Sequence, residues 1–125
     1  MKVCVPCRYP GGPEAAPAAS FEDSDLFDYY EVHAGGSFVL TAETRPCLGG
    51  CSDPVEAVLR RGVEAVIVRD ISPDTLMRLK NASVKVYKGD VGQVRELILA
   101  LAADRLEEID IGEFGRLGRK KGKGV

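Results

Sequence analysis

The chemistry most readily available to this chain comes from sulfur. Its 125 residues include four cysteines, which lie in the stretches CVPC and PCLGGC. Thiolates are soft ligands that suit zinc, copper(I) and iron-sulfur clusters, and neighbouring thiols can also form a reversible disulfide. The four cysteines look like a complete tetrathiolate set, so the elements that carry them decide whether they can act together.

The first two cysteines belong to a predicted strand. MKVCVPC is short, β-branched and apolar, as expected of a buried central strand that ends at Pro6. Side chains on a strand alternate between its faces, so Cys4 and Cys7 point in opposite directions unless the strand has already ended. We therefore expect Cys4 to be a core residue and Cys7 to lie where the strand exits.

The second pair of cysteines lies in a predicted loop. Pro46 and the Gly-Gly pair favour a loop over a helix around Cys47 and Cys51, and the glycines let backbone N–H groups turn toward sulfur. The spacing alone leaves open a metal site, a turn with two inert thiols and a Cys47–Cys51 disulfide. The predicted metal ligands are Cys7, Cys47 and Cys51.

Strand and helix signals alternate along the rest of the chain. Strands are expected over 1–6, 26–32, 37–41, 63–68 and 84–87, and helices are expected to begin near residues 53, 72 and 90. This order predicts a three-layer α/β/α domain over residues 1–110, with a mixed five-stranded sheet that includes an antiparallel hairpin. Ligands of such sheets collect at the carboxyl edge of the parallel strands.

Several residues are predicted to meet at that carboxyl edge. Arg69 and Asp70 follow one strand, Lys88 and Gly89 follow another, and Ser72 caps a helix whose free N–H groups and dipole favour an anion. Arg69 and the helix starts would offset the negative charge of a bound cluster. The predicted cofactor-binding residues are Arg69, Asp70, Ser72, Gly49 and Gly50.

Other polar residues have simpler interpretations. His33 precedes the glycines of the hairpin and has no second histidine nearby, so we expect a surface turn. Three aspartates, Asp23, Asp25 and Asp28, could suggest a metal nuclease, but the first strand has no acidic residue where that chemistry would need one. The basic residues of 111–125 predict a flexible, solvated tail.

Composition limits the classes of partner. The formal charge of −2 and the pI of about 5.5 give the chain no overall attraction for nucleic acid or an anionic membrane. No segment resembles a signal peptide or reaches membrane-spanning length, so a cytoplasmic location is expected.

The chain is poor in amide side chains and rich in charged ones, which is typical of a heat-adapted source. Residues 8–20, rich in proline, glycine and alanine, predict a loop that covers something.

Three segments together resemble a known family. They are MKVCVPC, SFEDSDLFDYYEV and GVEAVIVRDISPDTLMRLKNASVKVYKGDVGQVRELILAL. Over most of residues 1–106 they are similar to the dinitrogenase iron-molybdenum cofactor biosynthesis family, the small cluster-binding domains related to nitrogenase accessory proteins. The resemblance implies a ribonuclease H-like fold that holds or passes on a metal-sulfur cluster, together with a protein that donates or accepts this cargo.

The chain departs from the family pattern in the loop before its first long helix. Family members often have histidines and glycines there, whereas this chain has PCLGGC, so thiolates replace imidazoles and favour a different metal centre or cargo. The cargo is expected to be iron-sulfur, molybdenum-containing, copper or zinc. The alternative function is a thiol redox or redox-sensing domain that uses Cys47 and Cys51. No catalytic residue is predicted.

Overall fold

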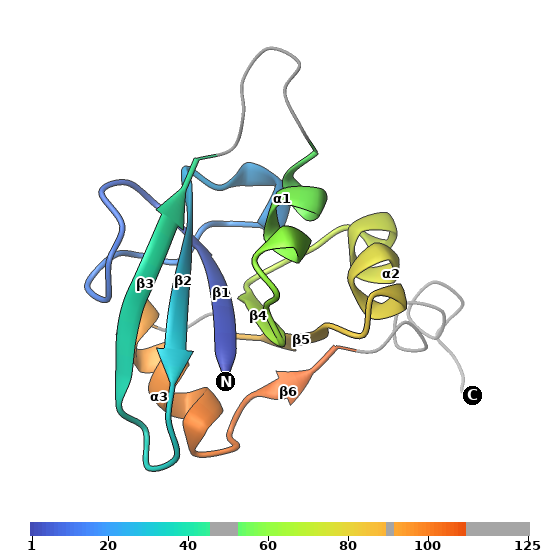
Figure 1. Cartoon of the computed structure of the whole chain (residues 1–125). Helices are drawn as coiled ribbons and strands as arrows, with labels where there is room; N and C mark the ends of the chain where they lie inside the picture. The colour runs from blue at the N-terminus through green and yellow to red at the C-terminus, as the bar shows by residue number, and fades with distance from the viewer. Residues whose placement is uncertain (46–52, 90–91, 110–125) are drawn as a thin grey trace, which may run out of the picture.

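One mixed β-sheet organises the part of the chain that the structure describes. The computed structural model describes residues 1–45, 53–89 and 92–109. Strands β1, β4 and β5 are parallel, whereas β2, β3 and β6 run antiparallel to their neighbours, in the order β3-β2-β1-β4-β5-β6 (Figure 1). The strands are β1 (Lys2–Cys7), β2 (Leu26–Val32), β3 (Phe38–Thr44), β4 (Ala65–Val68), β5 (Lys85–Lys88) and β6 (Glu107–Glu108).

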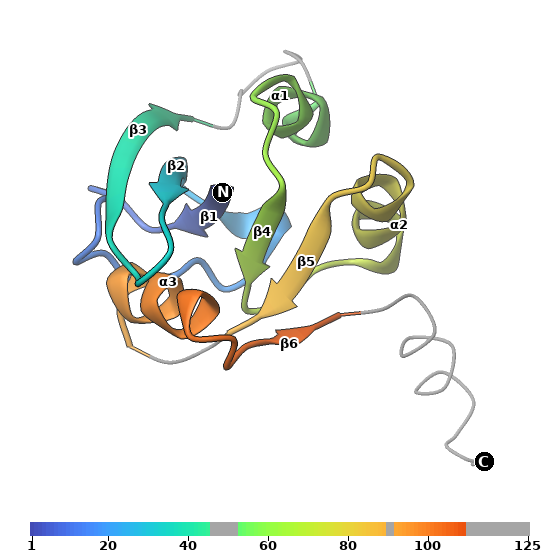
Figure 2. The same ribbon diagram turned by 60° about the horizontal axis from the view of Figure 1, so that its bottom comes forward.

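Helices cover both faces of this sheet. They are α1 (Pro54–Arg60), α2 (Pro73–Asn81) and α3 (Val94–Ala102), and a short 3-10 helix, η1 (Phe21–Asp23), precedes β2. In Figure 2, α1 and α2 lie on one side of the sheet and α3 lies on the other. The predicted α/β class and the predicted order of strands and helices are therefore confirmed.

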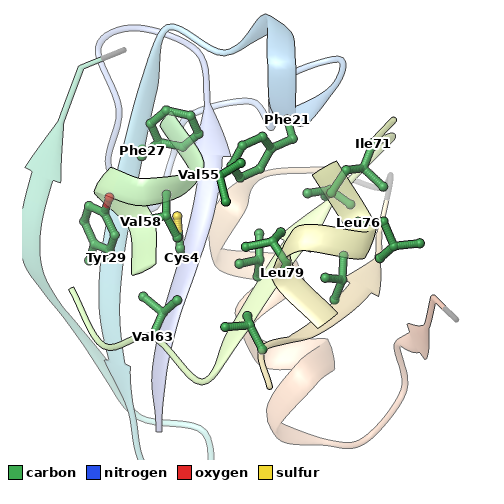
Figure 3. Packing of buried hydrophobic residues seen from close by; sticks show 14 residues of the cluster. Cys4, Phe21, Phe27, Tyr29, Val55, Val58, Val63, Ile71, Leu76 and Leu79 are labelled. Carbon is green, nitrogen blue, oxygen red and sulfur yellow. The ribbon is translucent and has the colours of Figure 1, made fainter. Parts of the chain in front are cut away.

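Two clusters of buried side chains fill the spaces between these layers. The cluster under α1 and α2 includes Cys4, Val58 and Leu79 (Figure 3). The cluster under α3 includes Val5, Cys7 and Leu97. Cys4 and Cys7 thus lie on opposite faces of β1, as the alternation of a strand requires. Cys4 is fully buried among apolar side chains, which confirms its prediction as a core residue.

The predicted count of five strands is wrong, because β6 adds a sixth. Its two residues, Glu107 and Glu108, pair with Lys88 and Tyr87 of β5. A two-residue strand of exposed glutamates has no alternation of apolar and polar side chains, so the sequence pattern could not reveal it. The ribonuclease H-like topology stays a prediction.

Two element boundaries also differ from the predicted ones. Strand β1 continues through Pro6 to Cys7. Proline has no N–H to donate, but the pairing of β1 with β4 involves only Val3 and Cys4, so no bond to β4 is lost at Pro6. Helix α3 begins at Val94 rather than near residue 90. Gln93 and Glu96 form a capping box at its start, and Gly92 adopts a positive φ of 59°, which a helix interior does not allow.

Candidate functional site

The carboxyl end of β1 places Cys7 beneath other segments of the chain. The Cys7 side chain has no solvent exposure and packs in the cluster under α3. Burial, followed by the negative charge of Asp28, raises the pKa of the Cys7 thiol above its ordinary value. In the described conformation Cys7 is therefore a protonated, covered thiol.

Beside Cys7, β2 carries an aspartate on its inward face. Asp28 has no solvent exposure, and its Oδ2 accepts a hydrogen bond of 2.6 Å from the backbone N–H of Gly12. Its Oδ1 has no hydrogen-bond partner among the described residues. A buried carboxylate oxygen without a partner is costly, so this aspartate is not an ordinary packing residue.

A second carboxylate lies across the strand pair from Asp28. Glu43 of β3 is its direct partner in the β2–β3 ladder, and like charges directly opposite each other are unfavourable. The hydrogen bond with Asp28, and then burial, raise the pKa of Glu43 to about 7. Near neutral pH Glu43 is therefore still partly protonated.

Residues 8–17 form an ordered segment that covers this region. Pro17 pairs with Cys7 through a backbone bridge, and Ala15 packs in the same cluster as Cys7. The first N–H groups of α3, those of Val94 and Arg95, donate to the carbonyl oxygens of Ala15 and Pro13. Residues 8–20 were expected to cover part of the molecule, and in the structure residues 8–17 lie over the region of the Cys7 thiol.

The predicted cofactor-binding residues of the β4–α2 turn serve local structural roles. Asp70 accepts a hydrogen bond from the N–H of Ile71 at 2.9 Å, and its own carbonyl accepts one from Phe21. Ser72 caps α2 by accepting from the N–H of Thr75. Arg69 is exposed after β4. All three lie at the carboxyl edge, as predicted.

Helix η1 lies between this turn and the end of β1. Glu22 accepts hydrogen bonds from both the N–H and the hydroxyl of Ser72, at 3.3 and 3.0 Å, so a carboxylate of the chain itself occupies the anion position at the start of α2. On its other side, Arg8 forms an ion pair with Asp23. The structure thus places Cys7 and Ser72 along one edge with η1 between them.

The other two helix starts are also capped. Asp53 accepts from the N–H of Val55 at the start of α1, and this bond lowers the pKa of Asp53. The capping box and the carbonyl groups of residues 13 and 15 cap α3. Further along the edge, an open hollow of about 500 Å³ is lined by Lys88, Gly89, Arg105 and Glu107. Lys88 and Gly89 were predicted at a ligand-binding edge.

A family model matches this chain over residues 1–104 and is described as dinitrogenase iron-molybdenum cofactor. The match spans far more than half of the sequence. The chain belongs to this family. The resemblance inferred from its segments is confirmed, and no curated protein matches the chain.

Solved structures agree with this membership. A Thermotoga protein provisionally described as NifB is 27% identical, with a TM-score of 0.66 over 86% of this chain and 91% of that one. A protein of Methanocaldococcus jannaschii, provisionally described as a dinitrogenase, is 16% identical, with a TM-score of 0.68 over 88% and 95%. The orange protein of Desulfovibrio gigas, in its apo form, is 13% identical, with a TM-score of 0.67 over 86% and 92%. The last two show the fold alone.

The remaining predicted site residues of this family member lie outside the described residues. These are Cys47, Gly49, Gly50 and Cys51, which separate Arg45 after β3 from Asp53 at the start of α1. Among residues 1–45, 53–89 and 92–109, no three histidine, cysteine or acidic side chains are arranged to hold a metal ion. A metal site with three protein ligands that uses Cys7 would therefore include residues outside these ranges, and 46–52 supplies the two predicted cysteines. The ligand set Cys7, Cys47 and Cys51 stays a prediction.

Sequence reasoning missed the importance of Asp28. The sequence presents Asp28 only as one of three possible nuclease aspartates, whereas the structure makes it the most deeply buried acid among the described residues. A signal was present, because Asp28 shares one face of its strand with Leu26, Tyr30 and Val32, which are all apolar or aromatic. His33 is exposed in the β2–β3 turn, as predicted. In the described segments, no helix has the length and apolar character needed to cross a membrane.

Proposed function

We propose that this protein is a binding and carrier domain for a metal-sulfur cluster or a thiophilic metal ion. The observation that carries the proposal is the family match over residues 1–104, combined with two cysteines in the segment between β3 and α1. The Desulfovibrio orange protein was solved in its apo form, which supports a ligand-binding role for this fold. The cargo class is iron-sulfur, molybdenum-containing, copper or zinc.

In this proposal Cys47 and Cys51 supply the thiolates that first meet the cargo. The end of β3 and the start of α1 lie at the same end of the sheet as the carboxyl end of β1 (Figure 1). Arg45 and Asp53 are the described residues closest to the two cysteines in sequence, so the chain leads into the segment from the edge where α/β sheets bind ligands. Cys7 is the proposed third thiolate, covered in the described conformation.

The proposed carrier role also implies a protein that delivers or receives the cargo. A carrier must release what it binds, so part of the metal's coordination has to be exchangeable with a partner. We place this exchange in the cytoplasm, where thiols stay reduced and available as ligands. Nucleic acid and membranes are not proposed as partners, because the formal charge of −2 gives no electrostatic attraction to either.

Metal analysis with a visible absorption spectrum after anaerobic purification tests this function. We expect the protein to carry, or take up, iron, copper, molybdenum or zinc, and the Cys47→Ser/Cys51→Ser variant to lose most of that metal. Cys4→Ala is the matched control, because Cys4 is buried in the other cluster and should not change the metal content. A colourless wild-type protein that takes up none of these metals would contradict the proposal.

Thiol counting separates the redox alternative from the carrier role. If Cys47 and Cys51 form a reversible disulfide, two more free thiols appear after reduction than before, and reduction does not depend on metal. A metal-binding protein instead releases its metal when these thiols are alkylated. The alternative would be favoured by a disulfide in the purified protein together with no metal uptake by the reduced form.

A further inference from the structure

Segment 8–17, which we call the strap, seals the Cys7 thiol from solvent. Pro17 forms a backbone bridge with Cys7, the N–H of Ala18 donates to the carbonyl of Pro6, and Ala15 completes the packing. The Cys7 side chain, which also packs against the side chains under α3, has no exposed surface. No reagent, metal ion or partner thiol can reach its sulfur while the strap and α3 stay in these positions.

Most polar contacts that hold the tip of the strap are at the surface. The N–H of Tyr9 donates to Asp25, and Arg8 forms an ion pair with Asp23 whose side chains are 38% and 72% exposed. Arg95 and Glu14 form a third exposed pair. Solvent screens such interactions, so each contributes little to keeping the strap closed.

Asp28 is the buried side-chain anchor of the strap, in addition to the backbone N–H groups of Val94 and Arg95 that hold Ala15 and Pro13. Its fully buried carboxyl group accepts the N–H of Gly12 at 2.6 Å, and a buried hydrogen bond is harder to give up than an exposed one because its acceptor would lose its partner. Neighbouring groups face it from three elements: Cys7 of β1, Tyr30 of β2 and Glu43 of β3. Gly12 has a φ of 90°, a conformation that glycine adopts without strain.

We propose that Asp28 is a positioning residue that latches the strap, and that Cys7 becomes available to a thiophilic metal ion only when the strap opens. The unpaired Oδ1 of Asp28 fits this role, because a latch that is not fully satisfied is easier to release than one with every hydrogen bond made. The link to metal rests on the proposed function. The opening itself does not.

Alkylation of the native protein by iodoacetamide tests the latch. Cys4 and Cys7 share the tryptic peptide of residues 3–8, so fragment ions assign the label to one or the other. In the wild type we expect Cys7 to react faster than Cys4, because Cys7 needs only local opening of the strap. Asp28→Ala should accelerate labelling of Cys7 by about tenfold to a hundredfold, with little change at Cys4.

Cys4 serves as the internal control, because it is equally buried but lies under α1 and α2. Asp28→Asn keeps an oxygen that can accept from Gly12 and should restore most of the protection of Cys7. Equal acceleration at both cysteines, or none at Cys7, would overturn the latch. If Asp28→Ala does not fold, hydrogen exchange of the Gly12 amide in the wild type decides: exchange at the rate of the central β2 amides overturns the proposal, and faster exchange supports it.

A further experiment with added zinc tests the link between the latch and the proposed metal-binding function. Added zinc should slow labelling of Cys7 in Asp28→Ala and should not do so when Cys47 and Cys51 are serine. If zinc protects no cysteine, the metal-binding function fails while the labelling difference between Cys7 and Cys4 still stands. If zinc protects Cys47 and Cys51 but never Cys7, the metal-binding function stands and the role of Cys7 in this inference is overturned.

Discussion

Single side chains of β2 and β3 set the electrostatics beside Cys7. Asp28 and Glu43 are direct cross-strand partners, and the hydrogen bond between them, followed by burial, raises the pKa of Glu43 to about 7. Because the folded state holds this proton more tightly than the unfolded chain, its stabilising effect is fully present below the ordinary pKa of Glu43. It is lost as the pH rises through about 7.

Replacing Glu43 by glutamine should remove this pH dependence. Glutamine keeps a donor for Asp28 and cannot ionise, so Glu43→Gln should be more stable than the wild type at pH 8 and similar to it near pH 4. The gain should be less than about 1 kcal/mol, because Glu43 is exposed and solvent screens the pair. Thermal unfolding followed by circular dichroism across this pH range measures it. A gain that is as large at pH 4 as at pH 8 would contradict the raised pKa of Glu43.

The sequence was enough to predict which face of a strand a side chain occupies, but not which distant residue it contacts. The alternation of MKVCVPC correctly separated Cys4 from Cys7. The partner of Asp28 is Gly12, sixteen residues earlier in a loop without periodicity, and nothing local encodes that contact. The same limit applies to Glu22, whose carboxylate reaches Ser72 fifty residues away.

Helices and strands were predictable wherever caps and periodicity agreed. The starts of α2 and α1 were predicted from Ser72-Pro73 and Asp53-Pro54. A capping side chain and a proline at the first helical position act within one turn, so their effect can be read from the local sequence. The start of α3 was predicted too early. Val91 has the spacing of the apolar stripe, but the positive φ of Gly92 is not helical, so the helix begins only after it. Strand β6 depends on its pairing with β5, which is a tertiary effect.

The cap of α2 yields a prediction at the scale of this element. Ser72→Ala should lower the free energy of unfolding by about 1 kcal/mol, because the N–H of Thr75 loses its acceptor and Glu22 loses a donor. Chemical denaturation measures the change. Metal content should stay the same, since the Ser72 hydroxyl already contacts Thr75 and Glu22. Loss of metal with unchanged stability would instead support the sequence-based assignment of Ser72 to the cofactor.

At the scale of the whole molecule, β4 couples the two clusters of buried side chains. Val66 and Val68 belong to the cluster under α1 and α2, whereas Ala65 and Ile67 belong to the cluster under α3. Because consecutive residues of one strand serve both faces, a loss of packing on one face is transmitted to the other through the backbone of β4. The described layers should therefore unfold together.

Truncation of one buried leucine on α3 tests this coupling. Leu97 is fully buried, so Leu97→Ala should lower the free energy of unfolding by about 2–5 kcal/mol, through lost burial and the cavity left behind. Leu99→Ala on the same helix is the matched control, because Leu99 is 40% exposed and its truncation should cost well under 1 kcal/mol. If unfolding is cooperative, Leu97→Ala should accelerate hydrogen exchange of the β4 amides and of the α2 amides, on the opposite face, by the same factor. Faster exchange confined to α3 would mean that its layer opens alone, and Cys7 would then be reached from the α3 side as well as through the strap.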